Sequence, residues 1–187
     1  MNRDRQRRTE GVIALLLFGL TIPAANWMLG HVGTVCVPSG PCLVPVWPGI
    51  DAPSGVLMIG LALVLRDIVQ RRLGPLAGLA AIAAGSLISA LLAPPAIVMA
   101  SVAAFTLSEL ADFAVYTPLQ RRRFVTAVVA SGIAGLVVDS VVFLHLAFGN
   151  LDFLAGQILG KTWMILLALP LMHLLRRRDE RLGLVAA

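Results

Sequence analysis

The chain has 187 residues, of which 58% are hydrophobic and only 13% are charged. A soluble domain of this length would need a more polar surface, so the composition excludes an ordinary soluble protein. The formal net charge of +5 does not indicate nucleic-acid binding, because no basic stripe is interleaved with aromatic residues.

The basic residues form clusters that separate long apolar stretches. Fourteen of the fifteen Lys and Arg residues lie at 3–8, 66–72, 121–123 and 176–181. Every second connection between apolar stretches is basic, and the others carry neither Lys nor Arg. The positive-inside rule produces this alternation in a protein with an even number of membrane spans. We therefore expect both termini to face the cytoplasm.

Each apolar stretch has about the twenty residues needed to cross a hydrocarbon core of ~30 Å. The first follows a basic segment, as in a signal peptide, but its length and poor cleavage site favour a retained helix. The sequence thus predicts an all-α integral membrane protein, N-in and C-in, with one domain over 1–187 and cytoplasmic tails at about 1–10 and 176–187. Three plus three helices would permit an inverted repeat, although similarity between the halves does not establish one. The six predicted transmembrane helices cover 11–29, 53–71, 76–92, a segment ending at 116, 124–148 and 153–175.

The loop between the first two helices is rich in Gly, Pro and Val and contains both cysteines of the chain, Cys36 and Cys42. A disulfide and two unlinked thiols are both compatible with this sequence. A metal site is not expected there, because no further Cys or His pair lies nearby. Small residues at four-residue spacing predict close helix packing elsewhere: Gly74 with Gly78, Ala81 with Gly85, and Gly156 with Gly160.

Charged residues inside the predicted spans are the strongest indication of function, because each costs about 2.5 kcal/mol or more on insertion scales. With a rise of ~1.5 Å per residue, Arg66 lies about 20 Å and Glu109 about 22 Å from the outer surface. The two side chains are therefore expected to meet in the inner half of the membrane. Asp67 and Asp112 are expected beside them.

A second charged layer is expected in the outer half of the membrane. Lys161 lies about 12 Å below the outer edge, and Asp139 about 22 Å from the inner end of its helix. Gln157 and Asn26 are expected nearby. Structural ion pairs are the plain alternative for each layer, but several buried pairs seldom improve stability over apolar packing.

Aromatic residues follow the same helical faces. Phe105 and Tyr116 share a face with Glu109 and Asp112, and Trp163 lies close to Lys161 in the sequence. Carboxylates beside rings suit a flat heterocycle with N–H donors, because the carboxylate accepts hydrogen bonds while the rings cover its faces. The ordinary alternative is that the rings only fill the bundle.

The sequence does not predict an enzyme. The three histidines are scattered, so neither a metal pair nor a nucleophile with a His partner is found. No phosphate-binding loop of the Walker type is present, and the chain is not expected to hydrolyse ATP itself. No cofactor is expected.

Four segments resemble one known family. SELADFAVYTPLQ at 108–120, GLVVDSVVFLHLAFG at 135–149 and GQILGKTWMILLALP at 156–170 are similar to the vitamin uptake transporter (VUT) family, whose members are also called queuosine precursor transporters. APSGVLMIGLALVLRDIVQRRLG at 52–74 resembles the second-helix segment of that family, with its Arg-Asp pair. The resemblance extends in order over about 52–175.

The resemblance implies an inner-membrane importer of 7-deazaguanine precursors of the tRNA base queuosine. From their chemistry, Glu109 or Asp139 would accept hydrogen bonds from the purine-like edge, Gln157 would read the carbonyl edge, and the rings would stack on the base. The basic side chains would balance the carboxylates or gate the site. The small size would suit a homodimer in the lipid bilayer. The candidate substrate-binding residues are Asn26, Arg66, Asp67, Phe105, Glu109, Asp112, Tyr116, Asp139, Gln157, Lys161 and Trp163.

Other functions stay open at this point. The chain could be the substrate-binding subunit of an importer with a separate energising complex, which would make transport depend on other subunits. A membrane enzyme acting on lipid would need a nucleophile or metal set near the headgroups, and none is found. A membrane assembly role predicts that neutral replacements of the buried charges change stability but not flux.

Overall fold

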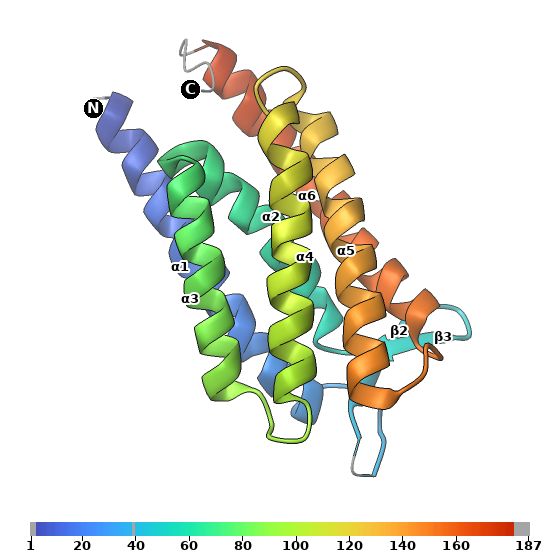
Figure 1. Ribbon diagram of the computed structural model, residues 1–187. Helices are drawn as coiled ribbons and strands as arrows, with labels where there is room; N and C mark the ends of the chain where they lie inside the picture. Colours follow the sequence, from blue (N-terminus) through green and yellow to red (C-terminus); the bar gives the residue numbers. More distant parts are fainter. Residues whose placement is uncertain (1–2, 39, 182–187) are drawn as a thin grey trace.

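The computed structural model describes residues 3–38 and 40–181, which form six helices and three short strands. The strands lie at one end of the bundle (Figure 1). At the other end lie both ends of the described chain, the turn between the second and third helices, and the connection between the fourth and fifth helices. The elements are α1 Arg3–His31, β1 Val35–Cys36, β2 Cys42–Trp47, β3 Ile50–Pro53, α2 Val56–Leu73, α3 Pro75–Leu92, α4 Val98–Leu119, α5 Phe124–Phe148 and α6 Leu154–Arg181.

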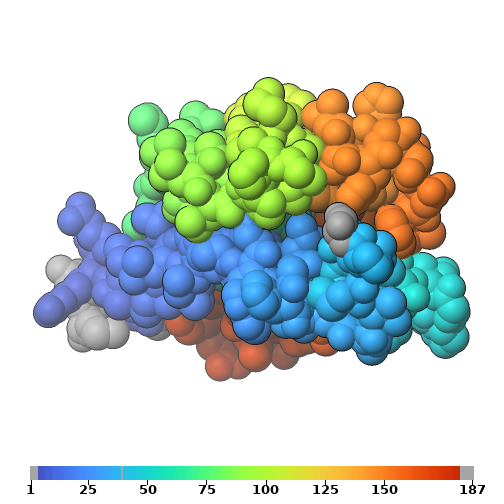
Figure 2. All heavy atoms as spheres, turned by 90° about the horizontal axis from the view of Figure 1, so that it is seen from below, coloured from blue at the N-terminus to red at the C-terminus, as the bar shows by residue number. Residues whose placement is uncertain are grey.

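The helices pack around α2. In the view from the strand end, α3, α4 and α5 form one row in green to orange, and the blue α1 and cyan strand segment lie against it (Figure 2). The helix α2 contacts each of the other five helices and buries twelve of its eighteen residues. Large apolar side chains of α1, α3 and α6 instead point outward, as Leu16, Leu76 and Leu167 do at 63%, 80% and 70% exposure. Such a surface matches contact with lipid.

Within the described residues, five helices are long and apolar enough to cross a membrane: α1, α3, α4, α5 and α6. The expected class, a helical membrane protein, is thus confirmed. The sixth predicted span does not meet this criterion of length and hydropathy. The exception is α2, which carries Arg66, Asp67, Arg71 and Arg72 within eighteen residues. Because α2 is enclosed by other helices, it need not present an apolar surface to lipid.

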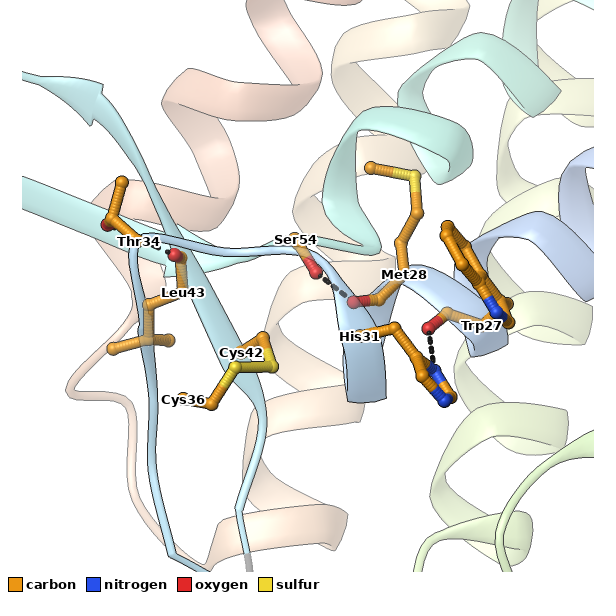
Figure 3. The surroundings of a disulfide bond; sticks show 8 residues. All are labelled: Trp27, Met28, His31, Thr34, Cys36, Cys42, Leu43 and Ser54. Atoms are coloured by element: carbon orange, nitrogen blue, oxygen red, sulfur yellow. Dashed lines mark hydrogen bonds between the residues drawn. A yellow bond between two sulfur atoms is a disulfide. The ribbon is translucent and has the colours of Figure 1, made fainter.

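The strands were not expected from the sequence, which predicted an irregular loop. They form an antiparallel sheet in the order β1-β2-β3. The β2–β3 turn contains Gly49 at φ 76°, a left-handed conformation that glycine adopts without a Cβ penalty. Cys36 pairs with Cys42 across β1 and β2, and the two form a disulfide (Figure 3). Of the two alternatives for the cysteines, a disulfide or two unlinked thiols, the structure shows the disulfide.

The sheet is fixed to the end of α1. The Ser54 hydroxyl, which follows β3, donates to the Met28 carbonyl at 2.7 Å, and the Thr34 hydroxyl donates to the Leu43 carbonyl at 3.4 Å (Figure 3). A Cβ at Gly33 would lie 2.5 Å from that same Leu43 oxygen. The chain after α1 therefore lies directly on β2.

The helix ends extend further than predicted: α1 already begins at Arg3, and α6 continues to Arg181. The extra turns are held by ion pairs. Glu10 pairs with Arg72 at 3.0 Å and Arg178 at 2.6 Å. Asp179 pairs with Arg71 and Arg72, each at 2.9 Å.

Two of the expected small-residue pairs lie at tight contacts. A Cβ at Gly160 would lie 2.6 Å from Val56 Cγ2, and one at Gly85 would lie 2.6 Å from Phe105 Cζ. The backbones of α2 and α6 also approach closely at Gly60, a glycine that the spacing of small residues did not indicate. A Cβ there would lie 2.9 Å from both the Cα and the carbonyl oxygen of Lys161.

The substitution Gly60→Ala is therefore expected to lower the melting temperature of the purified protein. The added methyl meets backbone, and overpacking of this kind typically costs about 1–3 kcal/mol. The matched control is Gly19→Ala, because a Cβ at that helical glycine meets nothing within 4 Å. The control should be neutral or slightly stabilising, since Ala is the better helix former. Equal melting temperatures for the two variants would contradict the close packing of α2 on α6.

Candidate functional site

Lys161 is the centre of the charged group in the strand-side half of the bundle. Its ammonium donates to Asp139 Oδ2 at 2.6 Å, to Ser140 Oγ at 2.7 Å and to Gln157 Oε1 at 2.5 Å. Three acceptors match the three N–H donors of the ammonium. The lysine side chain has no solvent exposure in the structure. This group joins α5 to α6.

A small cavity adjoins the lysine. Its volume is about 70 Å³, and Asp139, Gln157 and Lys161 reach it from α5 and α6. The rings of Phe105 and Phe143 line it from α4 and α5. Further lining residues are Asn26 and Ile22 of α1, Val56 and Ile59 of α2, Ser89 of α3 and Ser101 of α4.

The cavity is far smaller than a typical ligand site of about 300–1,000 Å³. A ligand of that ordinary size would enter only if the lining helices moved apart. The lining combines apolar and aromatic side chains with a few convergent polar groups, which is typical of small-molecule sites. The cavity is therefore a candidate small-molecule site that is narrow in this structure.

Arg66 is the centre of a second charged group, called the inner group below. It lies nearer the end of the bundle at which both ends of the described chain are found. Its guanidinium binds Glu109 Oε2 at 3.1 Å, Asp67 Oδ1 at 3.0 Å and Gln70 Oε1 at 2.7 Å, and it also pairs with Asp112. All three carboxylates and the guanidinium are buried, with exposures of 0–1%. One cation thus faces three carboxylates, and the group carries more acid than base if all are ionised.

Neighbouring residues complete this inner group. Asp67 also accepts a hydrogen bond from the Ser131 hydroxyl of α5 at 3.3 Å. The Arg66 guanidinium carbon lies 5.8 Å from the Phe113 ring centre and 5.7 Å from that of Tyr116, within the range of cation–π attraction. Among the described residues, the buried Tyr116 hydroxyl has no hydrogen-bond partner.

The two groups are linked through shared helices. Phe105 lines the cavity, and Glu109, one turn further along α4, binds Arg66. On α2, Gly60 lies against the Lys161 backbone, and Arg66 follows less than two turns later. A movement of α2 or α4 that opens the cavity must therefore also displace partners of Arg66.

The pairings expected from depth are confirmed: Arg66 binds Glu109, and Lys161 binds Asp139. The remaining predicted site residues divide between the two groups. The cavity has Asn26, Phe105 and Gln157 in its lining, and the inner group contains Asp67, Asp112 and Tyr116.

Trp163 lies apart from both groups. Its indole N–H donates to the Val46 carbonyl at 3.0 Å, and its ring stacks on Trp47 at 6.3 Å. The reason is helical geometry, because two residues correspond to about 200° of rotation from Lys161. Nearness in sequence was the wrong criterion for this ring.

Other members of the groups were missed. Gln70 bridges Arg66 and the Thr117 hydroxyl, to which it donates at 2.9 Å. Its spacing of four residues from Arg66 on the same helix could have identified it. Ser140 and Ser131 lacked such a signal, because a serine in a helix most often bonds only to its own backbone.

The described residues form a multi-pass membrane protein of α-helices with a small cavity, lined by apolar and aromatic side chains and a few polar groups. The chain matches the family model described as "Putative vitamin uptake transporter" over residues 56–175, and it belongs to that family. The matched region contains both charged groups and begins after the sheet. Comparisons with curated proteins and with solved structures gave no match. No group of three His, Cys, Asp or Glu side chains in 3–38 or 40–181 could hold a metal ion.

The excess of acidic groups around Arg66 predicts losses of stability of different size for two neutral substitutions. Arg66→Gln leaves three buried carboxylates without their cation, and breaking a buried pair in this way costs about 3–5 kcal/mol. Glu109→Gln removes one of the three carboxylates and keeps a hydrogen-bonding side chain, so its cost should be much smaller. Melting temperatures of the purified variants test the difference, with the exposed Arg177→Gln as a control. A larger drop in melting temperature for Glu109→Gln than for Arg66→Gln would contradict an excess of acidic groups around Arg66.

Proposed function

We propose that this protein imports 7-deazaguanine-type bases, the precursors of queuosine, into the cytoplasm. Membership of the uptake-transporter family supports transport, and the resemblance of its motifs to queuosine precursor transporters supports the substrate class. The observation that carries the proposal is the cavity with an anionic acceptor, an amide and two rings converging on it. A deazaguanine base presents N–H donors, a carbonyl and flat faces, and each has a matching group there.

In the proposed complex, Asp139 accepts N–H donors from the base and Gln157 reads its carbonyl edge. Phe105 and Phe143 cover the two faces of the ring system. In the structure, Asp139 and Gln157 both accept hydrogen bonds from Lys161. The substrate therefore competes with Lys161 for these acceptors, and binding frees the lysine to rearrange.

The inner group around Arg66 then controls whether the substrate cavity opens toward the cytoplasm. Arg66 binds carboxylates of α4 and a neighbour on α2, so it holds the two helices together below the cavity. Buried carboxylates of this kind can take up protons, and proton coupling is one way to power the step. A facilitative mode needs the same residues without net proton movement.

We also propose that all six helices span the inner membrane, with both termini in the cytoplasm and the whole chain as one domain. The ends of the described chain and the clusters at 121–123 and 176–181 lie at one end of the bundle, as the positive-inside rule requires of a cytoplasmic side (Figure 1). The disulfide at the opposite end fits an oxidising compartment.

Reporter fusions test this topology. Alkaline phosphatase fused after residue 95, in the α3–α4 connection, should be active because that connection faces the periplasm. The same reporter fused after residue 122 should be inactive, whereas green fluorescent protein fused there should fluoresce. If α2 does not span the membrane, the phosphatase activities of the two fusions would be reversed or equal.

Uptake of a labelled deazaguanine base tests the function, in cells that lack their own synthesis and import. Asp139→Ala and Glu109→Ala should abolish uptake at equal expression. Gln157→Leu should lower it at least about tenfold, because a hydrogen bond to a polar substrate group is lost and a buried group is left unpaired.

Ser140→Ala is the matched control, because Ser140 accepts from the same lysine but does not line the cavity. Its uptake should stay near the wild-type value, as should that of Trp163→Phe. Normal uptake by Asp139→Ala and Glu109→Ala would overturn the site. Uptake that appears only when further subunits are supplied would favour a substrate-binding subunit. Wild-type protein that gives no uptake, alone or with partners, would favour an assembly role.

A further inference from the structure

A large cavity opens at the basic end of the bundle, away from the candidate substrate site. Its volume is about 1120 Å³, and it lies between the first turns of α1, the α2–α3 turn and the end of α4. No lining residue is shared with the small cavity around Lys161. The proposed substrate site does not use this space, which adjoins the charged group around Arg66 through Gln70 and Thr117.

The lining is strongly basic. It includes Arg5, Arg7 and Arg8 of α1 and Arg121 after α4, together with Arg71 and Arg72 of α2. The Glu10 and Asp179 carboxylates already pair with the two arginines of α2. Within the part of the chain that the structure describes, no ion pair involves Arg5, Arg8 or Arg121, and Asp4 is the single carboxylate in the lining. The cavity therefore attracts an anion.

The same cavity is apolar on the side toward the middle of the bundle. Val12 and Ile13 line it and are 48% and 52% exposed. Further along α1, Leu16 and Leu20 continue this outward apolar surface, at 63% and 62% exposure. A free phosphate or nucleotide would make no use of such a surface, whereas an acyl chain would lie along it.

We propose that this cavity binds an anionic phospholipid, with the phosphate among Arg5, Arg8 and Arg121 and an acyl chain along Val12 and Ile13. Basic pockets between transmembrane helices at the cytoplasmic side bind anionic headgroups by this combination of charge and apolar contact. The lipid would connect α1 to the end of α4. This proposal does not depend on which solute is transported.

The test is native mass spectrometry of the purified protein in neutral detergent, after incubation with dioleoyl-phosphatidylglycerol or dioleoyl-phosphatidylcholine. The wild type should retain phosphatidylglycerol saturably and phosphatidylcholine weakly. The triple substitution Arg5→Gln, Arg8→Gln and Arg121→Gln should weaken retention at least about tenfold, since each basic residue near a lipid surface contributes on the order of fivefold.

The control removes the same number of charges from outside the cavity, by Arg176→Gln, Arg177→Gln and Arg181→Gln. It should retain phosphatidylglycerol like the wild type, and both triple variants should elute as monodisperse protein. An equal loss in the two triples, or equal binding by all three proteins, would overturn the site.

A second comparison separates a lipid from a free anion. Val12→Thr with Ile13→Thr keeps every charge and should still weaken phosphatidylglycerol retention, while inorganic phosphate should fail to displace the lipid. Displacement by phosphate at millimolar concentration, with full retention by the double variant, would show a free-anion site and overturn the lipid assignment.

Discussion

The arginine buried in α2 sets the main constraint on this protein. Arg66 has no solvent exposure, and an unpaired charge in a membrane bundle is costly. Its neutralisation takes acceptors from two helices, and α4 provides Glu109 and Asp112. Because α2 carries four charged residues, it lies enclosed by the other helices, and these present their own leucines to the outside.

Close packing at one glycine joins this constraint to the candidate site. At Gly60 the α2 backbone approaches Lys161, whose ammonium is the centre of the second polar group. Lys161 in turn holds Asp139 and Gln157 at the wall of the small cavity. The proposed substrate acceptors are therefore positioned by the same helix that contains Arg66. We therefore expect that opening the cavity beside Lys161 also moves the residues around Arg66.

The sequence predicted those parts of the structure that follow from helix geometry. A rise of ~1.5 Å per residue was enough to pair Arg66 with Glu109 and Asp139 with Lys161. It failed for Trp163, where the direction of the side chain, and not its depth, decides the neighbours. The strands at 35–53 were missed because a segment rich in Gly, Pro and Val does not show which of its residues pair as hairpins. The disulfide stayed undecided for a similar reason, since the spacing of two cysteines does not determine how their strands pair.

Direct binding to the purified protein tests the central claim most sharply, because it separates recognition from coupling, topology and partners. A tritiated deazaguanine base would be titrated against wild type, Asp139→Asn and Ser140→Ala in detergent, with guanine and adenine as competitors. We expect saturable binding to wild type and Ser140→Ala, loss of binding in Asp139→Asn, and stronger competition by guanine than by adenine. Saturable binding that Asp139→Asn leaves unchanged would place the substrate elsewhere and contradict the proposed role of Asp139.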